Sequence, residues 1–456
     1  MTMTTAEETG IEVVELLRAN GFTHVHEKFA AHLRALVSAE NLRDAWDSVQ
    51  RRHGRVTEVG EAVGEAGPAD VTTVRIPIDL ERGKLLIELV IDDSGRLTGL
   101  QLTPPTEPWR PPDHVDETAF DEQDVTLGTD PYTVSGTLTT PRQSTGCPAV
   151  VLLAGGGPFD RDGTAGSNKP LKDLAWGLAG RGIAVLRFDK ITHTHRNAVS
   201  HVDGFTMTDE YVPQTVAAVG VLRAHPAVDA ERVFLLGHSM GGKVAPRVAA
   251  AEPAIAGMIL MAADAEPMHR AAVRVTRYLA ALSPGGEAAA RSAIETLTRQ
   301  AELVDAPELS PATPAGDLPL GLSAAYWLDL RDYDPVATAA AVGKPMLILQ
   351  GGRDYQVTVD DDLARWRAGL EGCRGVTIRV YDADNHLFFP GTGPSTPAEY
   401  AAPQHVDPQV VTDIATWLTT NSPGRPTRTC SDADLLARSG GPGSTALDPT
   451  AERPEA

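Results

Sequence analysis

The feature that most constrains the fold is a regular alternation of short aliphatic runs with helical segments between about residues 114 and 420. The runs are Val150–Leu153, Ile183–Phe188, Val233–Leu236, Met258–Met261, Met346–Leu349 and Thr377–Tyr381. Continuous apolar runs are typical of strands buried on both faces, and helical crossovers join strands that run parallel. We therefore expect an α/β fold with a mostly parallel sheet and helices on both faces.

One interval in this alternation, from about residue 265 to residue 341, is much longer than the others. It holds two helical stretches, Met268–Leu282 and Glu287–Leu303, followed by a proline-rich loop. An insertion of this size between two strands is typical of a segment that covers a site. We expect it to form a helical cap.

Residues 1–103 follow a different pattern, with helical periodicity first and strand-like runs afterwards. The strand-like runs are Val56–Val63, Val71–Ile78, Leu85–Ile91 and Leu97–Leu102. Helices followed by an antiparallel sheet indicate a separate α+β domain. Residues 104–113 are rich in proline, which lacks an N–H donor, and we expect a stiff linker there. The α/β domain then spans residues 114–420, and the polar residues 421–456 are expected to form a disordered tail.

The net charge of −21 limits the partners of the chain. A field of this sign repels phosphate backbones and anionic membrane surfaces, so we expect neither nucleic acid nor membrane as a partner. The N-terminal residues lack a basic segment followed by an apolar core, so they do not predict a secretory signal. We expect a cytoplasmic protein that acts on a small molecule, and a homo-oligomer remains open.

The strongest chemical signal is Gly237-His-Ser239-Met-Gly241, which closes an apolar run and opens a helical segment. A Gly-x-Ser-x-Gly match alone is weak. In a strand–turn–helix setting, however, the glycines permit a tight turn that pushes the serine outward as a nucleophile elbow. The alternative is a plain turn with an idle serine. We expect Ser239 to be a nucleophile.

A serine nucleophile needs a base, and His386 is the best placed histidine after Ser239. It follows Thr377–Tyr381, the last expected strand, and open sheets present reactive groups at the carboxyl ends of their strands. His269 lies in the expected cap, and His405 follows a proline-containing loop. We expect His386 to be the base.

The acid that orients this histidine should follow the preceding strand, and Asp354 lies just after Met346–Leu349. A carboxylate there accepts the Nδ1–H of His386 and stabilises the imidazolium. Asp382 and Asp384 are rival acids by proximity, but they would have to reach back along their own loop. We expect Asp354 to be the acid.

The oxyanion of a tetrahedral intermediate needs hydrogen-bond donors. One donor should be the main-chain N–H of Met240, the residue after the nucleophile. The second should come from the glycine-rich loop after Val150–Leu153, and Gly156 is the best candidate. A phosphate-binding loop is the weaker alternative, because the Lys-Ser/Thr ending of such loops is missing.

Two lesser features complete the candidate site. His193, His195 and His201 do not have the spacing of a metal site, so we expect no metal and no organic cofactor. Tyr326 and Trp327, at the end of the expected cap, are candidate substrate-binding residues, and ordinary cap packing explains them equally well.

Several segments of the chain resemble bacterial serine carboxylesterases of the α/β-hydrolase fold that carry a small N-terminal α+β domain. They are Asp160–Asp162, Asn168–Lys190, Tyr326–Leu330, Gln350–Gln356 and Asn385–Gly391. The resemblance covers nearly the whole α/β domain and, more loosely, the N-terminal one. It implies esterase activity on short acyl chains, with Ser239, Asp354 and His386 as the triad, and an NTF2-like shape for residues 1–103.

The residues and the resemblance together predict a serine hydrolase that cleaves a carboxylic ester with a short to medium acyl group through an acyl-enzyme on Ser239. An acyltransferase, cyclase or thioesterase acting on a specialised metabolite would use the same triad. A non-catalytic ligand-binding protein on a hydrolase scaffold is the alternative of another class, since fold does not dictate function.

Overall fold

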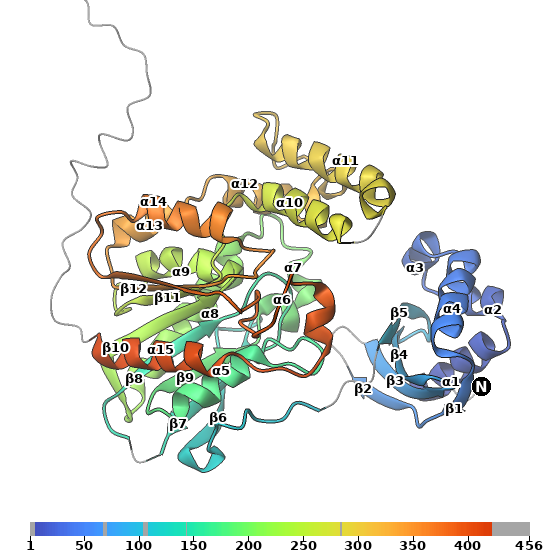
Figure 1. Ribbon diagram of the computed structural model, residues 1–456, viewed down its shortest axis with the longest axis horizontal. Coiled ribbons are helices and arrows are strands. Elements are labelled where there is room, and N and C mark those ends of the chain that lie inside the picture. The colour runs from blue at the N-terminus through green and yellow to red at the C-terminus, as the bar shows by residue number, and fades with distance from the viewer. Residues whose placement is uncertain (1–4, 67–70, 104–107, 143, 283–284, 422–456) are drawn as a thin grey trace, which may run out of the picture.

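The computed structural model describes residues 5–66, 71–103, 108–142, 144–282 and 285–421. Figure 1 shows two sheets, a small one near the N-terminus and a large one formed by the rest of the chain. Residues 108–112 of the expected linker form neither helix nor strand. The rest of that linker at 104–107, and the expected tail from residue 422 onward, lie outside the described residues.

In the N-terminal part, the described residues form four helices followed by a five-stranded antiparallel sheet. The helices are α1 (Ala6–Arg18), α2 (Phe22–Glu27), α3 (Ala31–Leu36) and α4 (Ala39–His53). The strands are β1 (Val56–Val59), β2 (Val63–Ala66), β3 (Val71–Leu80), β4 (Gly83–Asp92) and β5 (Leu97–Thr103). The order of helices before strands agrees with the expected α+β pattern, and the NTF2-like shape stays a prediction.

One expected strand of this sheet is two strands. The run Val56–Val63 divides into β1 and β2, which both pair with β3. Between them the N–H of Gly60 donates to the carbonyl of Pro77. The core forms where alternate residues of β3 meet apolar residues of α1, so one face of the sheet is buried.

The large sheet has eight strands in the order β13-β12-β11-β10-β8-β9-β7-β6. They are β6 (Phe120–Leu127), β7 (Val134–Pro141), β8 (Cys147–Leu153), β9 (Ala184–Phe188), β10 (Val228–His238), β11 (Met258–Met261), β12 (Met346–Gly351) and β13 (Val376–Tyr381). The strands from β13 to β9 are parallel, whereas β7 and β6 run antiparallel at one edge. These two strands were not predicted, because their sequences are rich in polar residues.

Helices cover both faces of the large sheet. One face packs against α5 (Pro170–Ala179) and α15 (Pro408–Thr420). The other face packs against α8 (Met207–Ala224), α9 (Met240–Ala251), α13 (Pro335–Val342) and α14 (Ala364–Gly369). Within β8, Val150 and Leu152 join the first core while Val151 and Leu153 join the second, as expected of a strand buried on both sides.

Between β11 and β12, the described residues form three helices before α13, namely α10 (Met268–Ala281), α11 (Gly286–Asp305) and α12 (Ala324–Arg331). Figure 1 shows α10 and α11 packed together outside the sheet, at the place expected of a cap. Short turns of helix complete the structure: α6 (Ile191–Thr194), α7 (Arg196–Val199), Glu117–Ala119, Ala315–Asp317, Pro319–Gly321, Val359–Leu363 and Pro397–Ala401. Among the described helices, none combines the length and apolarity needed to cross a bilayer.

Candidate active site

Ser239 lies at a sharp turn between the end of β10 at His238 and the start of α9 at Met240. Its backbone has φ 54° and ψ −123°, a conformation that non-glycine residues rarely adopt. The turn is tight enough that a Cβ on Gly237 would lie 2.2 Å from the carbonyl oxygen of Gly241, and a Cβ on Gly241 2.4 Å from that of Leu153. Both glycines of the motif are therefore required by close backbone contact.

Asp354 lies in the loop after β12, and its side chain is buried. Its Oδ1 accepts hydrogen bonds from the N–H groups of Gln356 (2.8 Å) and Val357 (3.0 Å). Its Oδ2 accepts the Nδ1–H of His386 at 2.7 Å. Main-chain donors thus fix one oxygen of the carboxylate, while the other faces the imidazole.

His386 lies in the loop after β13, and 6% of its surface is exposed. Burial alone would lower its pKa, but the Asp354 carboxylate raises it, and the net result is a pKa above the ordinary value for histidine. The imidazole is therefore oriented by Asp354 and stabilised in its protonated form. Such a group is suited to take a proton from a neighbouring hydroxyl and hold it.

The rival residues lie in other environments. Asp384 is buried, and neither of its carboxylate oxygens has a hydrogen-bond partner among the described residues; burial followed by the charge of Asp407 raises its pKa to about 7. Asp382 is exposed. His269 contacts Asp305 in the cap, and His405 contacts Asp173. Among these residues, Asp354 is the carboxylate that contacts His386.

Ser239 and His386 line one cavity with a volume of about 1030 Å³. Gly156, Met240 and Tyr326 line it as well, so five of the seven residues predicted for the site, Asp354 and Trp327 excepted, share its wall. Much of the remaining wall is apolar, from Phe159, Leu171, Val199, Phe205, Met268, Val275 and Leu322. The cavity can hold an apolar group beside the serine hydroxyl.

The loop expected to supply the second oxyanion donor lies against the elbow. A Cβ on Gly155 would lie 3.2 Å from Cβ of Ser239, and a Cβ on Gly156 would lie 3.4 Å from Cε of Met240. The contact arises because β8, which leads into this loop, is the direct neighbour of β10. Gly156 and the first residue of α9 therefore flank the serine, as donors to an oxyanion would.

The two aromatic residues expected to bind substrate have different environments. Tyr326 lines the cavity, and its hydroxyl donates to Oε2 of Glu210 at 2.6 Å. Trp327 has no exposed surface and is absent from the cavity wall, and its indole N–H donates to the carbonyl of Pro319. The structure therefore corrects the assignment of Trp327, which is a core residue of the cap.

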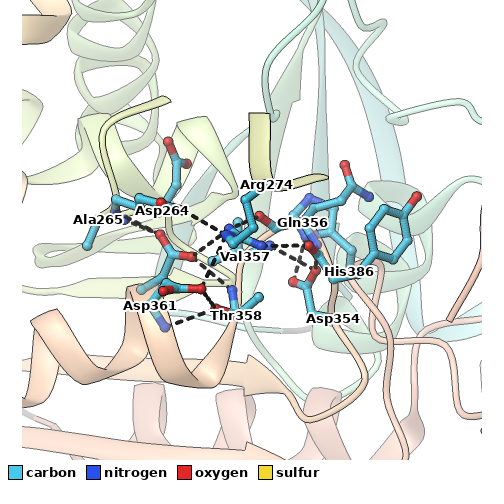
Figure 2. Close-up of polar contacts among 12 residues, drawn as sticks. Asp264, Ala265, Arg274, Asp354, Gln356, Val357, Thr358, Asp361 and His386 are labelled. Carbon is cyan, nitrogen blue, oxygen red and sulfur yellow. Dashed lines mark hydrogen bonds and ion pairs between the residues drawn. The ribbon is translucent and has the colours of Figure 1, made fainter. Parts of the chain in front are cut away.

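The cap contacts the loop of Asp354 through Arg274 of α10 (Figure 2). The guanidinium donates to the carbonyls of Tyr355 (2.9 Å) and Gln356 (3.0 Å). These carbonyls belong to the same two peptide groups whose N–H groups, on Gln356 and Val357, donate to Asp354. Because a peptide group is planar, Arg274 also fixes the direction of the two N–H groups that donate to Asp354.

Arg274 is itself held by acidic side chains. It contacts Glu266 at 2.9 Å, Asp361 at 3.2 Å and Asp362 at 3.6 Å. Asp362 in turn accepts the N–H groups of Ala265 and Glu266, which lie at the start of the cap segment. The loop of Asp354 and the cap therefore form one network of hydrogen bonds and ion pairs, which Figure 2 shows.

The described residues contain no group of three or more His, Cys, Asp or Glu side chains arranged to hold a metal ion. His193 and His195 instead contact main-chain carbonyls, of Pro158 and Thr133 respectively. His201 contacts the carbonyl of Asn197. Each of these histidines thus contacts a main-chain carbonyl group.

Sequence reasoning did not single out four residues that support the site: His238, Lys190, Glu210 and Arg274. His238 was visible inside the elbow motif, but nothing in the motif indicated that its ring would contact His386. The other three act through partners far away in the chain, so no local pattern marks them.

Comparison with known proteins shows the family of the chain. The family described as serine aminopeptidase, S33 (Hydrolase_4) matches residues 162–389. Esterase EstD of Thermotoga maritima is 33% identical over 408 residues, which cover 89% of this chain and 93% of the relative. The chain therefore matches this relative over the N-terminal part as well as the α/β part.

Solved structures with similarity include two esterases. Est1E from Butyrivibrio proteoclasticus is 16% identical, with a TM-score of 0.42 over 65% of this chain and 99% of its own. The Pyrococcus furiosus esterase Pf2001 is also 16% identical, with a TM-score of 0.42 over 70% of this chain and 99% of its own.

The expected fold and family are confirmed by the family match, by the full-length relative and by the mostly parallel sheet with helices on both faces. The resemblance to serine carboxylesterases therefore holds for the chain. It belongs to the serine aminopeptidase S33 (Hydrolase_4) family and is a carboxylesterase-type serine hydrolase of the α/β-hydrolase fold.

Proposed function

We propose that the chain hydrolyses carboxylic esters with short to medium acyl groups through an acyl-enzyme on Ser239. His386 is the general base and acid, and Asp354 orients it. The observation that carries the proposal is the 2.7 Å hydrogen bond from His386 Nδ1 to Asp354 Oδ2, with His386 and Ser239 on the wall of one cavity. The 33% identity to Esterase EstD supports the ester as the bond that is cleaved.

The reaction proceeds in two halves. Ser239 Oγ attacks the acyl carbon while His386 takes its proton, and the carbonyl electrons form an oxyanion that the N–H groups of Met240 and Gly156 stabilise. The intermediate collapses, and the leaving alcohol takes the proton from His386. Water then attacks the acyl-enzyme by the same route and releases the acid and the serine.

The nucleophile is tested by covalent labelling with a fluorophosphonate. We expect the wild-type chain to be labelled and Ser239→Ala to remain unlabelled. Ser200→Ala is the matched control, because Ser200 is an exposed serine on the same cavity wall and its removal should leave labelling intact. An unlabelled wild-type chain, or a labelled Ser239→Ala, would refute the assignment.

The acyl preference is tested with p-nitrophenyl esters of increasing chain length. The largely apolar wall predicts that kcat/KM rises from acetate to medium chains, since each buried methylene adds about 0.8 kcal/mol. Running the series with a competing alcohol separates hydrolysis from acyl transfer. A new ester as the main product would contradict hydrolysis.

A further inference from the structure

A buried ion pair lies beneath the candidate oxyanion loop. Lys190, just after β9, and Glu210, in the first turn of α8, are 2.9 Å apart, and their side chains are 2% and 6% exposed. Moving two charges out of water costs free energy, and their mutual attraction does not reliably recover it. A gain in stability alone therefore does not explain why this pair is buried. The other contacts that its side chains make indicate its role.

The main-chain carbonyl of Gly155 is the common target of these contacts. Lys190 Nζ donates to it at 2.8 Å, and the hydroxyl of Tyr211 lies at 2.8 Å from the same oxygen. Lys190 also lies 2.7 Å from the Tyr211 hydroxyl, so the two donors support each other. Both side chains are buried, so water does not compete with them for the carbonyl.

The Gly155 carbonyl belongs to the same peptide group as the N–H of Gly156. A trans peptide is planar, and its C=O and N–H point in opposite directions. Lys190 and Tyr211 hold the oxygen on one side, so the Gly156 N–H points away from them. Gly156 lines the cavity beside Ser239, which is where an oxyanion donor is needed.

The three glycines of this loop have no side chains with which to fix its orientation. Gly155, Gly156 and Gly157 are consecutive, and Gly157 adopts a φ of +114°. Glycine backbones populate many conformations, so the peptide plane must be fixed by groups outside the loop. A charged donor on the carbonyl also polarises the peptide, which makes its N–H a stronger donor.

Glu210 completes the arrangement by balancing the lysine charge and linking it to the cap. Its Oε1 accepts the hydroxyl of Thr192 at 2.9 Å, and its Oε2 accepts the hydroxyl of Tyr326 in α12 at 2.6 Å. The carboxylate therefore has a partner on each oxygen. The cap helix reaches the oxyanion loop through Tyr326, Glu210 and Lys190.

We propose that Lys190 and Tyr211 are positioning residues that fix the Gly155–Gly156 peptide, so that the Gly156 N–H stabilises the oxyanion, with Glu210 compensating the lysine charge. This inference rests on the proposed function, because it assigns a role to groups around the proposed nucleophile. The residues act through a main-chain group and do not touch the substrate.

The test removes the charge pair without leaving a lone buried charge. In the double variant Lys190→Met/Glu210→Gln we expect kcat to fall by about 10- to 100-fold, somewhat less than the loss of a whole oxyanion donor, while KM stays within about twofold. Tyr211→Phe removes the second donor without a charge change and should lower kcat by a smaller factor. Thermal unfolding of each variant shows that it is folded.

A second readout separates positioning from a general structural effect. A trifluoromethyl ketone forms a tetrahedral adduct with the serine, and its oxygen occupies the oxyanion site. Its affinity should fall by the same factor as kcat/KM in the double variant. Arg187→Met is the control: it breaks two other ion pairs of a buried residue on β9, with Glu122 and Asp162, and should lower stability while leaving kcat and ketone affinity unchanged.

The outcomes are distinguishable from failure of the proposed function. If the wild-type chain is not labelled by the fluorophosphonate, Ser239 is not the nucleophile, and both the proposed function and this inference fail. A labelled and active wild type together with a double variant of unchanged kcat and ketone affinity would overturn the inference alone. A loss that lies entirely in KM would overturn it as well, because ground-state binding does not require the oxyanion donor.

Discussion

The Nε2 atom of His238 lies 2.8 Å from the main-chain carbonyl oxygen of His386, and the two imidazole rings are 4.7 Å apart. The residue before the candidate nucleophile thus holds the backbone of the candidate base. Burial, followed by the neighbouring His386, lowers the pKa of His238 to about 3. His238 is therefore neutral at every pH at which the enzyme is expected to work, and its Nε2–H remains a donor.

Replacing His238 with Phe should keep the ring packing and remove this hydrogen bond. We expect kcat to fall by about tenfold, because a small displacement of a catalytic group lowers the rate steeply. Titration with a fluorophosphonate should still give full labelling, only more slowly. An unchanged kcat would show that the bond does not position His386.

The pH profile reports the protonation of His386. The base must be neutral to act, and Asp354 raises its pKa, so kcat/KM should rise with pH through a midpoint above about 6.5, the ordinary value for histidine. In Asp354→Asn that midpoint should move to lower pH, and the plateau should fall by about 10³–10⁴-fold. A midpoint that does not move would contradict the role of Asp354.

Arg274 links the cap to the loop of Asp354, so its loss should loosen the main-chain N–H groups that donate to Asp354. We expect Arg274→Met to lower kcat by about tenfold through misplacement of the carboxylate, and to shift the rising limb of the pH profile to lower pH as Asp354 separates from His386. Arg270→Met is the control on the same helix, since Arg270 is exposed and pairs with Asp305 in the cap. Equal effects of the two substitutions would contradict the proposed link.

Asp384 should make stability depend on pH. Its pKa is raised to about 7 in the folded chain and is near 4 in an unfolded one. The folded state therefore disfavours the ionised carboxylate, which lowers the free energy of unfolding. This loss of stability is absent below about pH 4, grows as the pH rises towards 7 and is complete above it.

Asp384→Asn removes that ionisation. Relative to wild type, its free energy of unfolding should increase between pH 4 and pH 8, by up to about 4 kcal/mol. The exposed Asp382→Asn serves as the control and should show no such trend. Denaturant unfolding at several pH values measures both. A difference that stays constant with pH would contradict a raised pKa at Asp384.

Local sequence patterns were sufficient for the parallel strands and for the elbow. A buried strand is a continuous apolar run, and the spacing of the glycines around Ser239 in a strand–turn–helix setting marks the elbow, although Gly241 also meets the distant carbonyl of Leu153. The rule that parallel strands present their carboxyl ends at one edge led to Asp354 and His386, because each follows its own strand directly. The strands β6 and β7 lacked such a pattern, because polar residues interrupt the apolar ones along both of them.

Tertiary structure decided the rest. Tyr326 and Trp327 are adjacent on one helix, where successive side chains point about 100° apart, so only the packing of the cap determined that Tyr326 lines the cavity and Trp327 enters the core. Lys190 and Glu210 come together only because β9 and α8 are folded against each other. The sequence determined which local elements form and where reactive groups follow them. The side chains that hold those groups in place belong to distant segments. Before the chain folds, they do not interact with the reactive groups, so no local pattern can reveal them.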